Sequence, residues 1–210
     1  YSLMIRNRRF RLLAFAGTFL FGALFLYIAA APDYVMTHLR LDETQFGWFF
    51  VPTIAGMGFG AFVSGRMAGK VAGISLVRWG FAICATSVFL NLLYAGNTAR
   101  LELPWAVMPM SGLAFGVALI FPILTIALLD MYPHIRGTAS SMQAFISLMA
   151  NAMISGLLVP LVSKNTALMA ALSCLFVAMA YGFWRMYLAL PHPALQCTDQ
   201  PAAFEPMDEM

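Results

Sequence analysis

Six long stretches of this chain contain no Asp, Glu, Lys or Arg, and almost every charged residue lies between them. They cover residues 12–32, 44–65, 79–99, 103–129, 137–163 and 165–184. A helix needs about 20 apolar residues to cross a hydrocarbon core of ~30 Å, and each stretch reaches that length. Because the bilayer core offers no water to the backbone, this pattern predicts six membrane-spanning helices.

The composition favours a helical membrane protein over the alternatives. Hydrophobic residues make up 61% of the chain and charged residues only 10%, whereas a water-soluble domain carries about 25% charged residues. Strands of a membrane barrel would alternate polar and apolar residues, but these stretches are continuously apolar. A soluble bundle would need a polar face on its outer helices, and none is left here. The predicted fold class is therefore all-α integral membrane.

Basic residues favour one side of the predicted bundle. If the N-terminus faces the cytoplasm, the cytoplasmic side holds Arg6, Arg8, Arg9, Arg11, Arg66, Lys70, Arg78, Arg136 and Arg185, and the far side holds Arg40, Arg100 and Lys164. This bias follows the positive-inside rule and predicts a plasma-membrane protein, typically of a bacterial inner membrane, with both termini in the cytoplasm. The net charge of +3 is spread over short loops. It therefore indicates attraction to anionic lipid and not a nucleic-acid partner.

The two ends of the chain differ from the predicted bundle of residues 12–190. Residues 1–11 are basic and start with Tyr1, so we interpret them as the end of a cytoplasmic linker in a longer membrane protein. Residues 191–210 contain four prolines and four acidic residues. That composition predicts a disordered cytoplasmic tail.

A short basic loop follows the second stretch. Before it, Gly56 and Gly60 form a small-xxx-small pattern, which lets helix backbones approach closely in a membrane. Arg66 and Lys70 then lie at the cytoplasmic end of this packed pair, where they can meet phosphates, helix C-terminal carbonyls or an acidic partner such as Asp130. They are either part of a cytoplasmic gate or simple positive-inside anchors.

Polar residues recur every four positions in the fifth stretch, at Gln143, Ser147, Asn151 and Ser155. This spacing places them on one side of a helix. Asn and Gln side chains in hydrocarbon need partners, so the stripe should face protein or water. It either lines a substrate path, for which we single out the first three residues, or holds helices together through hydrogen bonds.

Residues 60–70, Gly-Ala-Phe-Val-Ser-Gly-Arg-Met-Ala-Gly-Lys, resemble the loop between the second and third helices of the C-terminal half of major facilitator superfamily transporters. Gly65 stands near the position of the family's usual acidic residue, and one extra residue precedes Gly69. Two further segments resemble the Bcr/CflA drug-resistance branch. They are residues 27–35 (Tyr-Ile-Ala-Ala-Ala-Pro-Asp-Tyr-Val) leading into 45–47, and residues 136–141 (Arg-Gly-Thr-Ala-Ser-Ser).

The resemblance covers nearly the whole chain up to about Leu190, and it implies two inverted three-helix repeats that form half of a transporter fold. The implied partners are an N-terminal six-helix half, a small-molecule substrate and the lipid bilayer. No cofactor is implied, and the proton gradient would drive transport. The first and fourth helices would line the cavity, through Leu24, Tyr27, Phe121 and Thr125. The implied cytoplasmic gate consists of Gly60, Gly65, Arg66, Gly69, Lys70, Asp130 and Arg136.

The stretches contain no deeply placed acid, which bears on coupling. A proton-coupled antiporter needs a titrating carboxylate, so we expect this acid outside the chain, with Asp33 as the local alternative.

An enzyme is disfavoured. Residues 73–75 could begin the signature of an intramembrane serine protease, but every histidine lies in a loop or the tail, so no general base is within reach of the serine. No metal-ligand spacing is present, and no enzyme is predicted. The prediction is proton-coupled drug efflux by alternating access. A transporter for another metabolite, and a non-transporting channel or structural protein, remain the alternatives.

Overall fold

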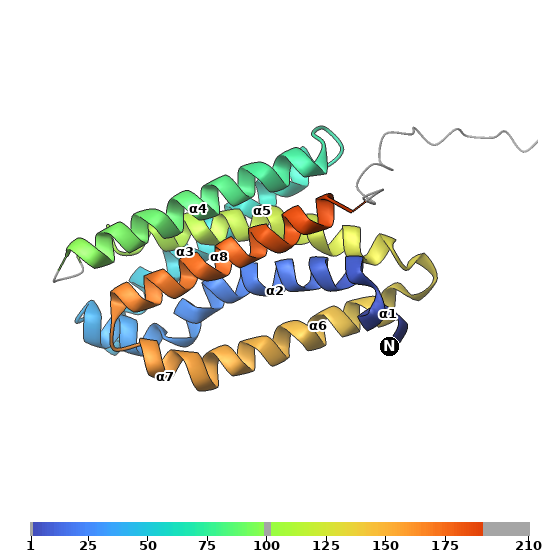
Figure 1. Ribbon diagram of the computed structural model, residues 1–210. Helices are drawn as coiled ribbons and strands as arrows, with labels where there is room; N and C mark the ends of the chain where they lie inside the picture. The colour runs from blue at the N-terminus through green and yellow to red at the C-terminus, as the bar shows by residue number, and fades with distance from the viewer. Residues whose placement is uncertain (1, 99–101, 191–210) are drawn as a thin grey trace, which may run out of the picture.

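The computed structural model describes residues 2–98 and 102–190, and within these ranges six helices are long and apolar enough to cross a membrane (Figure 1). These spans are α2 (Arg8–Ala29), α3 (Gly47–Met67), α4 (Gly73–Asn97), α5 (Met108–Asp130), the composite fifth span Pro133–Val162, and α8 (Thr166–Leu188). The prediction of an all-α membrane protein with six spans is confirmed. The helices also extend into the charged flanks, because α2 begins at Arg8 and α4 contains Arg78.

Short elements connect or precede the spans. They are α1 (Ser2–Arg6), the π-helical turn η1 (Asp33–His38), and the 3₁₀ turns η2 (Glu43–Gln45) and η3 (Pro133–Ile135). In the turn between α3 and α4, Gly69 has a φ of 75°. Glycine adopts this left-handed conformation without a steric penalty, which explains a glycine at this point of the loop. The predicted tail, residues 191–210, lies outside the described residues. The assignment of residues 1–11 to a linker stays a prediction.

The fifth span is not one regular helix. It consists of η3, α6 (Arg136–Met153), the π-helical turn η4 (Ile154–Leu158) and α7 (Val159–Val162). Pro160 has no backbone N–H to donate, and its ring would crowd the carbonyl four residues earlier in a regular α-helix. The π turn immediately before it relieves this conflict by widening the helix.

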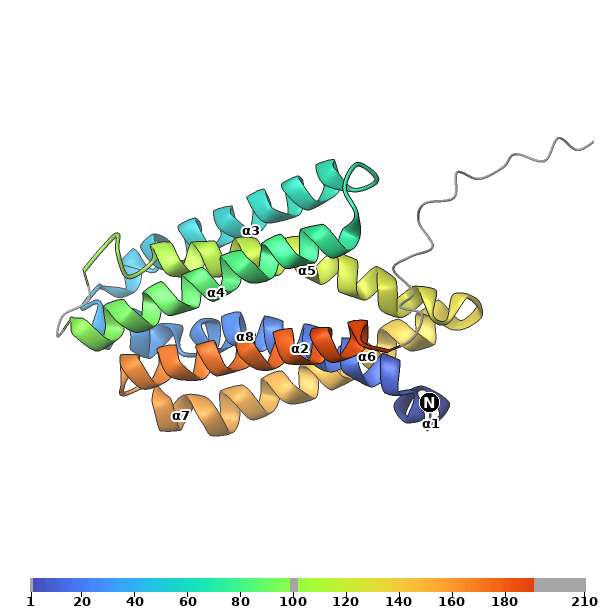
Figure 2. The same ribbon diagram turned by 45° about the horizontal axis from the view of Figure 1, so that its top comes forward.

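The spans pack in space as two groups, α3, α4 and α5 in one and α2, the fifth span and α8 in the other (Figure 2). Along the chain they form two triplets whose contacts correspond, with α2 and α5 exchanged between the packed groups. In the first triplet of spans are α2, α3 and α4, and in the second are α5, the fifth span and α8. The contact of α4 with α5 corresponds to that of α8 with α2, and the contact of α3 with α5 corresponds to that of the fifth span with α2. Since each triplet crosses the membrane an odd number of times, the second triplet runs in the opposite sense. The predicted inverted repeats agree with this pairing.

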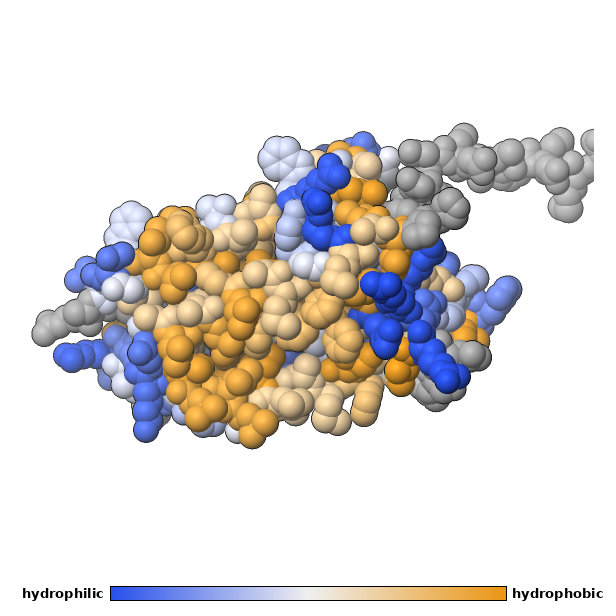
Figure 3. Space-filling view, in the orientation of Figure 1, coloured by the Kyte–Doolittle hydropathy of each residue, from blue (hydrophilic) through white to orange (hydrophobic). Residues whose placement is uncertain are grey.

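The surface has the distribution expected for a protein that spans a bilayer. In Figure 3 hydrophobic side chains cover the middle of the visible face, and hydrophilic side chains gather at its two ends. The spans carry large apolar side chains that are exposed, such as Phe59 on α3 and Phe89 on α4. Lipid or another membrane-embedded protein would cover them, since water does not favour such a surface.

Glycines on α3 bring its backbone directly against α5. A Cβ atom added at Gly56 would collide with the carbonyl oxygen of Ser111, and one added at Gly60 would collide with the carbonyl oxygen of Phe115. One turn further along, the Ser64 hydroxyl donates a hydrogen bond of 3.3 Å to the carbonyl of Leu119. The small-xxx-small pattern therefore marks a close helix contact, as the sequence predicted, and the structure identifies α5 as the partner.

The other side of α5 meets α4 in the same manner. Gly116 faces Cys84 and the carbonyl of Gly80, and Gly112 faces the hydroxyl of Ser87. These glycines allow close approach of the two helices, where van der Waals contact replaces the absent hydrophobic driving force. Helix α5 is thus packed between α3 and α4, with its backbone in close contact with both helices.

We expect Gly60→Ala to destabilise the bundle, because the new methyl group must displace the α5 backbone. Overpacking of this kind costs about 1–3 kcal/mol. Gly58→Ala is the matched control, since nothing lies within 4 Å of the position where its Cβ atom would stand. The free energy of unfolding of both variants would be measured in the same detergent. Equal changes in the two variants would contradict the close contact.

Candidate functional site

Side chains that form hydrogen bonds meet where α2, α5 and α6 come together. Gln143 on α6 donates from Nε2 to the Thr125 hydroxyl on α5, at 3.4 Å. One helical turn along α6, the Ser147 hydroxyl lies 3.1 Å from the Thr18 hydroxyl on α2. We call Thr18, Thr125, Gln143 and Ser147 the polar seam. It joins three helices inside an apolar bundle.

Aromatic rings lie beside the polar seam. The Phe21 ring centroid lies 6.1 Å from that of Phe121 and 6.1 Å from that of Phe25. The edge of Phe121 and the amide of Gln143 both lie against α2 at Gly17, each 3.7 Å from where a Cβ atom would stand. All three rings are partly exposed. Apolar rings with a few fixed hydrogen-bonding groups are the typical lining of a site for small amphipathic molecules.

The structure brings four of the predicted path residues together and separates others from them. Phe121, Thr125, Gln143 and Ser147 share the seam or its border. Leu24 and Tyr27 are instead buried inside the bundle, each with 1% of its surface exposed. The Tyr27 hydroxyl accepts a hydrogen bond of 2.6 Å from Asn91 Nδ2 on α4. In this conformation the two residues hold helices together, and their place in a substrate path stays a prediction.

The last two members of the α6 stripe have different surroundings. Asn151 is buried, and its Oδ1 atom has no hydrogen-bond partner among the described residues. Leaving a buried acceptor of this kind without a hydrogen bond costs about 1–3 kcal/mol of stability. A ligand group that donates a hydrogen bond to Asn151 Oδ1 would therefore bind favourably there. Ser155 lies in the π turn η4 and is exposed.

The cytoplasmic-loop residues predicted for the gate do not form one cluster. Asp130 pairs with Arg136, whose Nη2 atom lies 2.8 Å from Oδ1, and both side chains are about half exposed. Asp130 is therefore the partner of Arg136 and not of Arg66 or Lys70 in this structure. Arg66 lies in the last turn of α3 and Lys70 in the loop that follows. Both are exposed, and no acidic partner contacts them within the described residues.

The glycines of this loop have separate roles. Gly60 packs against α5, and Gly69 forms the turn. Gly65 has nothing within 4 Å of the position of a Cβ atom, so it makes no close contact here.

Three site residues were missed by sequence analysis: Thr18, Phe21 and Phe25. Their spacings of three and four residues place them on one face of α2. This signal was present in the sequence, but the segment is apolar on all sides and gave no reason to prefer that face.

A further contact lies away from the polar seam, in the π-helical turn η1 that follows α2. His38 Nε2 lies 2.6 Å from the Ser163 carbonyl oxygen, and this contact connects η1 to the end of the fifth span.

The chain was compared with known proteins. No protein-family model matches it. Over 156 residues it is 31% identical to a protein of Haemophilus influenzae described as a bicyclomycin resistance protein homolog. The matched segment is 73% of this chain and 38% of that protein, so the chain spans well under half the length of this relative. This match confirms the resemblance that the sequence motifs indicated.

The Thr18–Ser147 contact should contribute modestly to stability. Interhelical hydrogen bonds in membranes average roughly 0.6 kcal/mol in double-mutant cycles, so we expect a coupling of that size between Thr18→Val and Ser147→Ala. Thr18→Val combined with Ser155→Ala is the matched control, since Ser155 lies outside the polar seam. Unfolding free energies of the single and double variants measure both couplings. A coupling of zero for Thr18 and Ser147 would show that the two hydroxyls do not interact.

Proposed function

We propose that this chain, which belongs to the Bcr/CflA branch of the major facilitator superfamily, forms the C-terminal six-helix half of a secondary active transporter. Its substrates would be drugs or other small amphipathic molecules, which it would expel from the cell. The polar seam is the observation that supports this proposal. It combines hydrogen-bonding groups with partly exposed aromatic rings at the junction of three spanning helices.

A second six-helix half is the partner that this arrangement requires. Only 22% of the α3 span and of the fifth span is buried, compared with 67% of α2. Their exposed side chains include Phe59 and Phe62 on α3, and Leu148 and Met149 on α6. We propose that an N-terminal half covers part of this surface and that the two halves rock around the polar seam. Such rocking would expose the site alternately to the two sides of the membrane.

Proton coupling would need a carboxylate in the partner half. The described spans carry no Asp or Glu away from their ends. Asp33 lies in η1, beyond the end of α2, and is exposed. The proton gradient remains our proposed driving force, with the titrating acid supplied by the N-terminal half. Under this proposal the chain alone does not transport, because half of the site and the coupling acid are missing.

Drug efflux can be tested with the complete reading frame that contains this chain. We expect its expression in a bacterium without its main drug pumps to lower the accumulation of bicyclomycin or of fluorescent amphipathic cations. A protonophore should abolish the effect. Gln143→Leu should remove most of the transport, because it takes away the amide of the polar seam, whereas Ser155→Ala should retain it.

Each outcome bears on a different part of the proposal. A membrane-inserted protein that changes the accumulation of no amphipathic compound would refute drug efflux and favour another metabolite or a structural role. Transport that persists with the protonophore would refute the proton coupling but not the drug efflux. Equal transport by the Gln143→Leu variant and the unmodified protein would remove the polar seam from the substrate path.

A cytoplasmic gate at the α3–α4 loop makes a separate prediction. We expect Arg66→Gln with Lys70→Gln to lower transport roughly fivefold or more, the lower end of typical coupling between sites. The thermal midpoint should not change, because both side chains are exposed and unpaired with acids in this conformation. Arg8→Gln with Arg11→Gln removes two exposed cations at the same end of the bundle and serves as the control. An equal loss in both double variants would mean that these cations only anchor the chain.

A further inference from the structure

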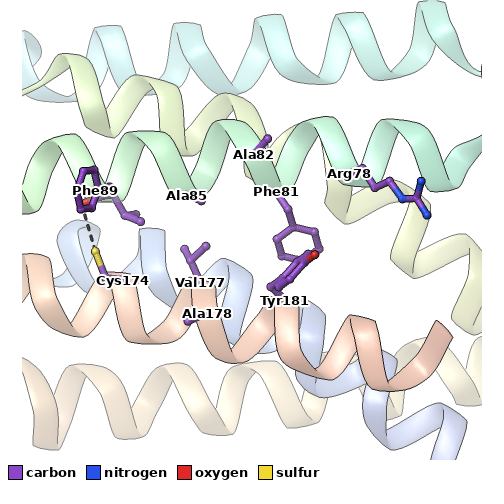
Figure 4. Close-up of a pocket in the computed structure, with 10 residues that line it drawn as sticks. Arg78, Phe81, Ala82, Ala85, Phe89, Cys174, Val177, Ala178 and Tyr181 are labelled. Atoms are coloured by element: carbon purple, nitrogen blue, oxygen red, sulfur yellow. Dashed lines mark hydrogen bonds between the residues drawn. The ribbon is translucent and has the colours of Figure 1, made fainter. Parts of the chain in front are cut away.

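A groove runs along the outer surface between α4 and α8, on the side formed by the last helix of each triplet (Figure 4). Its cavity volume is about 490 Å³. The middle of the groove is lined by small side chains, Ala82 and Ala85 on α4 and Ala178 on α8. All three are exposed, so the groove is open to the surroundings of the protein. It shares no residue with the polar seam.

The lining is almost entirely apolar and extends along the membrane normal. On α4 it reaches from Arg78 to Phe89, a rise of ~16 Å at 1.5 Å per residue. One leaflet of a ~30 Å hydrocarbon core has about this depth. At the deep end the groove is bounded by Phe89 and by Cys174, whose thiol donates to the Val88 carbonyl at 3.3 Å.

The shallow end of the groove is aromatic and positively charged. Phe81 and Tyr181 pack edge to face across it, with ring centroids 5.4 Å apart. Arg78 lines this end, and the guanidinium of Arg185 lies 6.0 Å from the centre of the Tyr181 ring. No acidic residue pairs with either arginine within the described part of the chain. Both arginines are exposed and available to an anion.

We propose that this groove binds one acyl chain of an anionic phospholipid, whose phosphate is held by Arg78 and Arg185. The apolar wall accepts the chain over the depth of one leaflet, and the two cations stand where the headgroup of that lipid would lie. The charge pattern argues against a second copy of the protein as the occupant, since two such faces would bring four arginines together. The inference needs only the spanning helices and does not depend on drug transport.

The test uses the full-length protein that contains this chain, purified in mild detergent after exposure to phosphatidylglycerol or phosphatidylcholine. Native mass spectrometry counts the lipids retained. We expect one phosphatidylglycerol to be retained in preference to phosphatidylcholine. Arg78→Gln and Arg185→Gln should each reduce that preference roughly fivefold, the contribution of one basic residue near an anionic surface.

Two control pairs separate the site from general effects. Arg8→Gln with Arg11→Gln removes charge at the same end of the bundle but away from the groove, and should leave the preference unchanged. Ala85→Phe fills the groove and should release the lipid, whereas Ala61→Phe on the exposed surface of α3 should not. Thermal midpoints of all variants establish that they are folded.

Three results would overturn the proposal. Equal retention of the two lipids would show that no anionic headgroup is recognised. A preference that survives both groove arginine variants would place the lipid elsewhere. A dimer that Ala85→Phe dissociates would identify a second copy of the protein as the occupant.

Discussion

The structure depends on backbone contact at both sides of α5. In lipid the hydrophobic effect does not press helices together, so their association relies on close van der Waals packing. Gly56 and Gly60 provide this packing on the α3 side, and Gly112 and Gly116 provide it on the α4 side. Because α5 is fixed from both sides, the parts of it that face α2 and α6 have a defined depth and rotation. The ring of Phe121 and the hydroxyl of Thr125 are positioned in this way.

The polar seam lies across the boundary between the two repeats. Thr18 belongs to the first triplet of spans, whereas Thr125, Gln143 and Ser147 belong to the second. The Thr18–Ser147 contact therefore joins the two triplets, as the glycine contacts of α3 and α4 with α5 also do. Interhelical hydrogen bonds in membranes are weak, roughly 0.6 kcal/mol each, so this one contact can be broken at low cost. A stronger ion pair at the same place would hold one conformation.

The spans and the close approach of another helix at Gly56 and Gly60 could be predicted because each rests on a local pattern, a long uncharged stretch or glycines four residues apart. The ends of the helices were less predictable, since arginine side chains can lie on a helix and still reach water. Pairing between distant helices was not predictable from one sequence. The bond between Tyr27 and Asn91 joins residues 64 positions apart, and neither residue indicates the other. Helix α2 is apolar on all sides, so periodicity did not show that Phe21 and not Leu24 borders the seam.

The repeat arrangement explains why the two candidate ligand sites lie where they do. If each helix of one triplet is replaced by the corresponding helix of the other, the α2–α5 contact and the α4–α8 contact remain contacts between the same two helices. Every other main contact becomes a contact between a different pair of helices. The polar seam borders the α2–α5 contact, and the groove between Arg78 and Phe89 follows the α4–α8 contact. The other main contacts join α5 to α3 and α4, and join α2 to the fifth span and α8, so each of these two groups of helices packs as a unit. Rotation of one group against the other would therefore change the α2–α5 and α4–α8 contacts together, so that the shape of the outer groove and the contact of Gln143 with Thr125 would both depend on one movement.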